Sequence, residues 1–342
     1  MNLRLSAISL AFVSTVALAA AGCQAATSGS SEPGSIKVAL PTSVTSFANA
    51  DVVVAEEKGF FDDVGLDVEL TNLKSGASTV KAVVGGQYEV GGSSIEPVVN
   101  AAAEGGDLRI IGSYADRLEV QVVTPKSIAS PAELQGQVLG VQEVGAFREV
   151  MTRMVLQDAG LTPEDVEYLP TNSDAYASAL IQGRIKSAVL HPEQTIAAAE
   201  ESSNLHPIAS LYDVEPKYHY GTYFGNGGWL EESPEDARKF MEAVTRAHRY
   251  MYTDKAAVVP IIAKATGFSE AVIDEAYDVY MSDVKAFPTD EGLDQERLEY
   301  TLDRMEELEV IEGERPSLDD LVAREPGEQA VKELGSVPDR TG

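Results

Sequence analysis

The chain contains one cysteine, Cys23, and one tryptophan, Trp229, among its 342 residues. A single cysteine cannot form an intramolecular disulfide, so the fold must be stabilised by its buried apolar side chains alone. Hydrophobic residues make up 44% of the sequence. A chain of this length and composition can bury one large core or two medium ones.

Basic residues are also scarce. Lysine and arginine total 26 against 55 aspartate and glutamate residues, which gives a net charge of −29. Such a charge repels the phosphate backbone of DNA and RNA, so we expect no nucleic-acid partner. The acidic residues are spread along the chain, which distinguishes it from a protein with one disordered acidic tail.

The sequence motifs of common enzymes are missing. The chain has no G-x-S-x-G nucleophile elbow, no G-x-x-x-x-G-K-[ST] phosphate loop and no H-E-x-x-H metal pair. Its four histidines lack the spacing of metal ligands; they are His191, His206, His219 and His248. We therefore expect a protein that is not an enzyme and that has no cofactor and no metal site.

An uncharged, apolar stretch precedes Cys23. Residues 5–21 are rich in leucine, alanine and valine, and Arg4 is the only charged residue before the cysteine. This pattern is typical of a secretory signal peptide, here residues 1–22. The run LAAAGC resembles a bacterial lipobox, in which the thiol is lipidated, although its leucine stands farther from the cysteine than that pattern favours. We expect an exported protein, lipid-anchored at Cys23 on the outer face of the cytoplasmic membrane, with residues 23–35 as a flexible tether. A free thiol within a signal peptide is the alternative.

Strand-like and helix-like segments alternate after the tether. The alternation begins at residues 36–40 and restarts after Pro131, and from Ser233 onward the pattern is almost wholly helical. Residues 82–104 are also similar to residues 179–201, at an offset of 97 residues. We expect an α/β fold of two similar lobes, each a mostly parallel sheet flanked by helices, with a cleft between them.

Small polar residues follow the predicted strands. In open α/β sheets, ligands bind beyond the carboxyl ends of the strands, where helix N-termini present N–H groups suited to anions. The candidate ligand-binding residues at these junctions are Ser43, Thr45, Ser46, Phe47, Ser75, Gly76, Ser93, Ser94, Gly145, Ala146, Phe147, Asn172, His191 and Glu193. The repeat aligns Ser94 with His191. Helix capping is the alternative role for each serine and asparagine.

Other candidates have more specific roles. Arg148, at a predicted helix start, suits bidentate binding of a sulfonate, phosphate or carboxylate, and its alternative is a solvated surface arginine. His191 suits a hydrogen bond or ring stacking, and its alternative is a capping or buried histidine. Phe47 and Trp229 are the aromatic residues that we expect to stack on a flat solute. Core packing is the alternative for them and for other aromatic residues near the predicted cleft, such as Tyr114 and Tyr220.

Three segments resemble a known family. They are SVTSFANADVVVAEEKGFFDDVGLDVEL, GGSSIEPVVNAAAEGGDLRIIGSYADR and SPAELQGQVLGVQEVGAFREVMTRMVLQDAGLTPEDVEYLP. They are similar to the solute-binding proteins of ABC importers in the SsuA/THI5-like (NMT1-like) family, over nearly the whole chain after the tether. The resemblance implies a two-lobe type II periplasmic-binding-protein fold with a two-strand hinge near residues 120–124 and 220–224. It further implies a first lobe of residues 36–124 and 220–325, a second lobe of residues 125–219, and a C-terminal tail of residues 326–342.

The resemblance also implies a function. We expect an extracytoplasmic, monomeric lipoprotein that captures a small organic solute by hinge closure and delivers it to an ABC permease in the membrane. Sulfonate, taurine or nitrate-like anions and heterocycles similar to thiamin precursors both remain candidate solutes. A pyrimidine-synthesising enzyme of the THI5-like fold and a ligand-sensing module for a membrane receptor are the alternatives. The thiamin-pyrimidine enzymes rely on a cysteine-rich segment that this chain lacks.

Overall fold

The computed structural model describes residues 34–337 and 340. These residues belong to one compact unit. The predicted signal peptide, Cys23 and the tether up to residue 33 lie outside the described residues. Gly34 and Ser35, which the sequence analysis assigns to the tether, are instead the first residues of strand β1.

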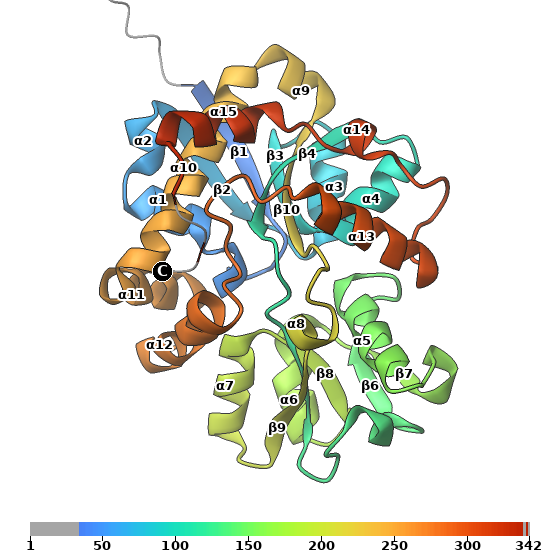
Figure 1. Ribbon diagram of the computed structural model, residues 1–342. Helices are drawn as coiled ribbons and strands as arrows, with labels where there is room; N and C mark the ends of the chain where they lie inside the picture. Colours follow the sequence, from blue (N-terminus) through green and yellow to red (C-terminus); the bar gives the residue numbers. More distant parts are fainter. Residues whose placement is uncertain (1–33, 338–339, 341–342) are drawn as a thin grey trace, which may run out of the picture. The chain divides into compact units, whose positions relative to one another are not determined.

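The first sheet has five strands in the order β2-β1-β3-β10-β4 (Figure 1). Strand β1 is parallel to β2 and β3, whereas β10 is antiparallel to its neighbours β3 and β4. The strands are β1 (Gly34–Leu40), β2 (Leu66–Asn72), β3 (Val90–Ser94), β4 (Leu108–Ala115) and β10 (Gly221–Asn226). We call this sheet and the helices around it the first lobe.

The second sheet repeats this arrangement in the order β7-β6-β8-β5-β9, and we call it and its helices the second lobe. Its antiparallel strand is β5, between β8 and β9. The strands are β5 (Gln121–Pro125), β6 (Val138–Val141), β7 (Glu167–Pro170), β8 (Ser187–Leu190) and β9 (Leu205–Ser210). The corresponding strands β3 and β8 begin at the predicted offset, so the repeat inferred from the sequence is confirmed.

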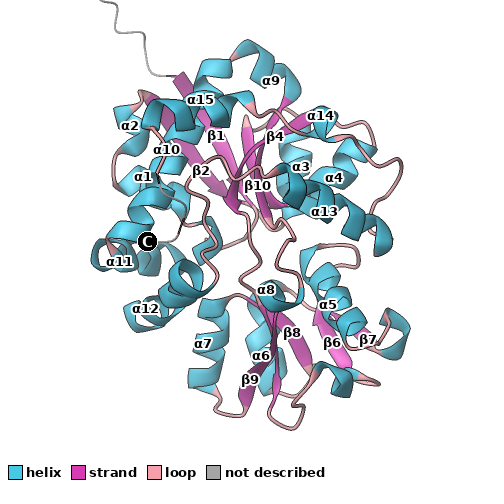
Figure 2. Ribbon diagram, viewed as in Figure 1, coloured by secondary structure: helices cyan, strands magenta, loops and turns pink. Residues whose placement is uncertain are grey.

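Helices flank both sheets (Figure 2). The first half of the chain supplies α1 (Asp51–Glu57), α2 (Phe60–Asp63), α3 (Gly76–Val84) and α4 (Ile95–Ala103) to the first lobe. The second lobe has α5 (Phe147–Asp158), α6 (Tyr176–Ile181), α7 (Pro192–Glu201) and, at its boundary, α8 (Leu211–Val214). Short helical turns are η1 (Phe47–Asn49), η2 (Pro131–Leu134), η3 (Pro163–Asp165) and η4 (Ser173–Ala175).

The C-terminal third is helical, as predicted. It comprises α9 (Gly227–Glu232), α10 (Pro234–Thr253), α11 (Lys255–Thr266), α12 (Glu270–Asp278), the π-helical turn η5 (Val279–Asp283), α13 (Gln295–Glu307), α14 (Leu318–Leu321) and α15 (Glu325–Leu334). Among the described residues no single helix is long and apolar enough to cross a membrane. Helices α11 and α12–η5, which are bent relative to each other, have the length and composition of a membrane span only when they are taken together.

Two expected boundaries need correction. Strand β5 pairs with β8 and β9, so residues 121–124 belong to the second sheet rather than to the first lobe. The chain therefore crosses between the sheets at residues 116–120 and again at residues 211–220. Residues 326–334, expected to be a tail, form most of α15, where Pro326, Gly327 and Ala330 are buried.

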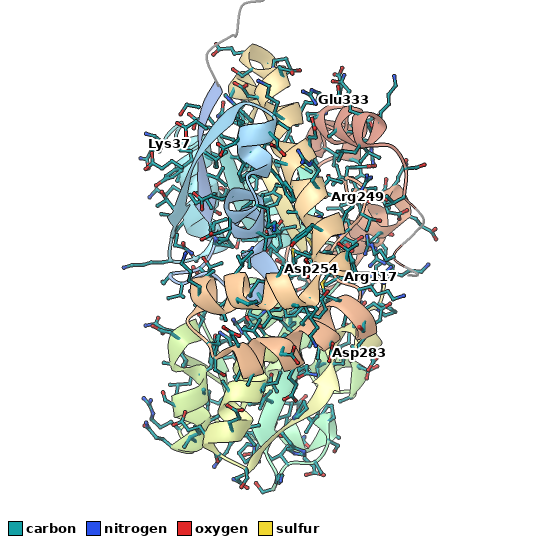
Figure 3. The ribbon with its side chains drawn as sticks, turned by 90° about the vertical axis from the view of Figure 1, so that its left-hand side faces the viewer. Lys37, Arg117, Arg249, Asp254, Asp283 and Glu333 are labelled. Atoms are coloured by element: carbon teal, nitrogen blue, oxygen red, sulfur yellow. The ribbon has the colours of Figure 1, made fainter. Side chains whose placement is uncertain are left out.

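The crossing segments are held by the C-terminal helices. Arg117 on the first crossing segment, labelled in Figure 3, donates a hydrogen bond to Val284 O over 2.9 Å. On the second crossing segment, the backbone N–H of His219 donates to Thr301 Oγ1 over 2.7 Å. Both contacts position the hinge region against the first lobe.

The helical segment between residues 51 and 63 is divided into two helices. Helix α1 ends at Glu57, and α2 begins after Gly59, whose φ of 71° lies in the left-handed region. Glycine adopts this conformation without the steric cost that a Cβ atom brings. The break turns the chain so that Phe61 of α2 packs against Phe240 of α10, with ring centroids 6.0 Å apart.

A buried carboxylate joins three elements of the first lobe. Asp51 of α1 accepts a hydrogen bond from Tyr223 Oη of β10 over 2.8 Å, and it lies 2.8 Å from His248 Nε2 of α10. The other ring nitrogen, Nδ1, lies 2.9 Å from Pro288 O. All three side chains are at most 1% exposed. Buried polar groups are tolerated where they are paired in this way.

Candidate functional site

A cavity of about 80 Å³ lies where the carboxyl ends of the parallel strands of both sheets face each other. Seven of the residues proposed from the sequence line it: Ser75, Gly76, Ser94, Ala146, Phe147, Arg148 and His191. Both lobes contribute to its wall, as expected for an interlobe cleft. Larger hollows of about 420 and 570 Å³ receive no residue from the second sheet or its helices.

Four helix N-termini meet at the cavity. Helices α3, α4, α5 and α7 begin directly after Ser75, Ser94, Ala146 and His191, and each of these N-cap residues lines the cavity. Only Ser75 caps its helix with a side-chain oxygen, which accepts from Ser78 N over 3.3 Å; Ser94 and Ala146 do not. At α7, His191 and Gln194 form a capping box. The remaining N–H groups at the helix starts, together with the helix dipoles, favour an anion in this cavity.

Glycine is needed at the first residue of α3. A Cβ atom on Gly76 would lie 2.2 Å from Ser93 Oγ. That hydroxyl is buried and has no hydrogen-bond partner among the described residues. The backbone of α3 consequently approaches β3 closely and places its N-terminus at the cavity.

Arg148 is the buried cation of the cavity. Its guanidinium donates to Val189 O and, over 3.3 Å, to Gln194 Oε1, and it lies 5.2 Å from the centroid of the Tyr176 ring. The side chain is 7% exposed, and none of the ion pairs within residues 34–337 and 340 includes it. A buried guanidinium without a carboxylate partner can bind an anion with its remaining N–H groups.

His191 is bound to a second buried residue, Glu119, on the first crossing segment. Nδ1 of the ring lies 2.7 Å from Glu119 Oε1, and the side chains of both residues are almost fully buried. Burial raises the pKa of the Glu119 carboxyl to about 8 and lowers the pKa of the His191 ring to about 4. Burial therefore favours the neutral form of each group.

Aromatic rings form one wall of the cavity. Phe147 stacks on Tyr220 with ring centroids 4.5 Å apart and an interplanar angle of 24°. Tyr114 meets Tyr220 edge-on at 5.5 Å. Burial raises the pKa of both tyrosines above the ordinary value, so they stay neutral. This wall offers an apolar surface and phenol groups to a solute.

Two residues proposed for the site bridge the lobes instead of lining the cavity. Glu193 of α7 accepts from Phe47 N over 3.1 Å and from Tyr280 Oη over 3.1 Å. The Phe47 ring is fully buried and stacks on Tyr280, with centroids 4.1 Å apart and planes 9° apart. The expectation that Phe47 stacks on a solute is therefore corrected, because the C-terminal helices supply its stacking partner.

Trp229 lies at the wrong end of the sheet for the cavity. It belongs to α9 after β10, and its ring packs near Gly225, beside the start of β4. Because β10 runs antiparallel to its neighbours, its carboxyl end lies opposite the carboxyl ends of the parallel strands. The expected stacking role of Trp229 is corrected for this reason.

The remaining proposed residues lie around the cavity without lining it. Thr45 and Asn72 share a hydrogen bond, and Ser46 donates to Asn49 Oδ1 over 2.9 Å. Gly145 donates from its backbone N–H to Glu149 Oε2 over 2.8 Å. Ser43 and Asn172 are exposed on loops, and Ser93 is buried behind Gly76.

Part of the cavity wall was not predicted from the sequence. The additional lining residues are Pro41, Thr42, Asn49, Lys74, Ala77, Pro97, Gln142, Glu143 and Ser173, together with Tyr114 and Tyr220, which were noted only as nearby aromatic residues. Most of them are close in sequence to a proposed residue. Including more residues on either side of each predicted strand end would therefore identify them. Thr42 Oγ1 is buried without a hydrogen-bond partner among the described residues. Within residues 34–337 and 340, no group of three or more His, Cys, Asp or Glu side chains could hold a metal ion.

Comparisons with known proteins agree with this architecture. The sequence pattern of the family described as NMT1/THI5 like matches residues 46–257. A protein described as a binding protein, from Brucella abortus (strain 2308), is 23% identical over 212 residues, which cover 62% of this chain and 66% of the relative. The 4-amino-5-hydroxymethyl-2-methylpyrimidine phosphate synthase of Aspergillus parasiticus is 24% identical over 223 residues, covering 61% of this chain and 64% of the synthase. The matched region thus spans just under two thirds of the length of these curated relatives.

Solved structures show the same fold. The periplasmic aliphatic sulphonate binding protein SsuA of Escherichia coli has a TM-score of 0.70 at 14% identity, covering 85% of this chain and 92% of SsuA. The periplasmic nitrate-binding protein NrtA of Synechocystis PCC 6803 has a TM-score of 0.71 at 12% identity, covering 89% of each chain. The predicted two-lobe periplasmic-binding-protein fold is confirmed. Since the family pattern covers more than half of the chain, this protein belongs to the NMT1/THI5-like family.

Proposed function

We propose that this protein is the extracytoplasmic solute-binding component of an ABC importer and that its solute is a small organic anion. The observation that carries the proposal is Arg148, a buried guanidinium without a carboxylate partner in a cavity where four helices begin. Two of the structural neighbours are described as binding aliphatic sulphonates and nitrate. A sulfonate or a similar oxyanion matches both the charge and the N–H donors of the cavity.

The size of the cavity favours a compact solute. Pockets for drug-sized ligands measure roughly 300 to 1,000 Å³, whereas this cavity measures about 80 Å³. Phe147 and Tyr220 offer an apolar surface for a short carbon chain next to the anionic group. A bulky heterocycle would require the lobes to separate further.

Closure of the lobes is part of the proposal. Glu193 and Tyr280 join the lobes by a hydrogen bond of 3.1 Å, and Phe47 N reinforces it. We regard this arrangement as the closed form and the crossing segments as the hinge. In this proposal each lobe consists of one sheet and the helices around it. The protein functions as a monomer.

Small-angle scattering of the purified protein tests this closure. We expect ethanesulfonate at saturating concentration to reduce the radius of gyration, because bound anion bridges helix N-termini of both lobes. A matched sample with the neutral compound 4-amino-5-hydroxymethyl-2-methylpyrimidine should keep the ligand-free profile. An unchanged profile with saturating ethanesulfonate would contradict closure, and compaction by the pyrimidine alone would instead favour a thiamin-precursor solute. Formation of 4-amino-5-hydroxymethyl-2-methylpyrimidine phosphate by the purified protein would favour the enzyme alternative.

Lipid anchoring at Cys23 is a separate part of the proposal. We expect Cys23→Ser to release the protein from the membrane fraction into the medium or periplasm, since serine cannot carry the thioether-linked lipid. Fractionation and immunoblotting measure this, with Ser28→Ala in the tether as the control that stays membrane-bound. Retention of the serine variant in the membrane would show that another feature holds the protein there.

A further inference from the structure

Glu119 is a buried carboxyl group that contacts the cavity through His191. Its Oε1 lies 2.7 Å from His191 Nδ1, while Oε2 has no hydrogen-bond partner among the described residues. The His191 ring lines the cavity, and its other nitrogen, Nε2, makes no hydrogen bond to the described part of the chain. Nε2 is therefore the ring atom available to a solute.

The proton held between the two groups decides what Nε2 offers. While that proton is present, either the carboxyl donates to Nδ1 or the ring is doubly protonated, and in both forms Nε2 carries a hydrogen and donates. Once the proton is lost, the carboxylate of Glu119 accepts from Nδ1–H, and Nε2 becomes an acceptor. Nε2 is therefore a donor before the proton is lost, whether Glu119 or His191 holds that proton.

We propose that Glu119 is a positioning residue for anionic solutes, because its proton keeps Nε2 of His191 a hydrogen-bond donor towards the cavity. This inference rests on the proposed function, since it needs an anion as the partner of Nε2. Loss of the proton removes the donor and also adds a negative charge behind the ring. Both changes oppose the binding of an anion.

The groups packed around the pair come from several elements. Arg148 on α5 favours the deprotonated carboxyl of Glu119, and Glu193 on α7 favours a charged His191 ring. The phenols that face the pair are those of Tyr114, Tyr220 and Tyr280, the last with Oη 3.4 Å from Glu119 Oε1. Burial is the largest influence on the pKa of Glu119, so the proton is retained up to about pH 8.

Calorimetric titration with ethanesulfonate between pH 6 and 10 tests the proposal, since this sulfonate keeps its charge throughout the range. For a carboxyl with a pKa of about 8, affinity of the unmodified protein should fall roughly thirtyfold from about pH 7 to about pH 9.5. In Glu119→Gln the amide N–H donates to Nδ1 as the protonated acid does, so Nε2 stays a donor. The variant should bind with near-normal affinity and a flat pH profile. The control Glu164→Gln, at an exposed position of the second lobe, should follow the unmodified protein.

Nitrogen NMR of histidine-labelled protein reads the tautomer directly. We expect a protonated Nε2 on His191 at pH 7 in both proteins, and its loss at high pH only in the protein that retains Glu119. A flat affinity profile for the unmodified protein, or a proton on Nδ1 alone at pH 7, would overturn the role of Glu119 and leave the proposed function standing. Failure of both proteins to bind ethanesulfonate at every pH would overturn the proposed function and this inference with it.

Discussion

Arg148→Ala is expected to weaken ethanesulfonate binding at least a hundredfold, a loss of about 2.7 kcal/mol. Arg148 is the buried cation of the cavity, and its free N–H groups are the strongest donors available to a sulfonate oxygen. Helix N-termini and Nε2 of His191 would then hold the anion, and a helix N-terminus typically contributes about 1 kcal/mol or less. Isothermal titration at pH 7 measures the change.

Two variants make this result specific. Arg148→Lys keeps the charge but loses the planar fork, so its affinity should fall between those of the alanine variant and the unmodified protein. Arg184→Ala removes an exposed arginine from the same lobe and should leave binding unchanged. Because Arg148 also donates to Val189 O, thermal unfolding must show that each variant is folded at the titration temperature. Binding by folded Arg148→Ala within threefold of normal would remove the main support for an anionic solute.

Asp51→Ala is expected to lower the free energy of unfolding by about 3 to 5 kcal/mol. The substitution leaves Tyr223 Oη and His248 Nε2 buried without their partner, and it disconnects α1 from β10 and α10. Unpaired buried polar groups cost more than the original hydrogen bonds contribute. Urea denaturation followed by circular dichroism gives the difference.

The matched controls separate burial from charge. Asp62→Ala removes an exposed carboxylate from the neighbouring helix α2 and should change stability by less than about 0.5 kcal/mol. Tyr223→Phe removes one donor and keeps the ring, so about 1.5 kcal/mol should be lost. A loss below about 1 kcal/mol for Asp51→Ala would mean that this network does not stabilise the first lobe.

The sequence predicted those parts of the site that depend on local pattern. Ser75, Ser94, Ala146 and His191 were identifiable because each stands between a strand and a helix, and the internal repeat aligned two of them. Arg148 was identifiable because it begins a helix at such a junction. Short stretches of sequence are enough to predict where strands end and helices begin. The fold class then predicts where these strand ends lie relative to the cleft.

Contacts between distant segments were not predictable. Glu119 and His191 are 72 residues apart in the chain, and Tyr280 is 161 residues from Glu119. Nothing near any of these residues indicates their partners. Phe47 and Trp229 show the same limit: their positions near strand ends were recognised, but the direction of β10 and the placement of Tyr280 decide where their rings lie.

The position of β10 in the first sheet has a consequence for the order of folding. The second sheet needs only residues 121–210, which are contiguous and can pair before the rest of the chain is synthesised. In the first sheet, β3 and β4 are separated by β10, so their shared partner emerges more than a hundred residues after them. Until then both strands have unpaired edges, which are prone to intermolecular pairing. The lobe synthesised first is therefore the one completed last, and residues 221–226 close it.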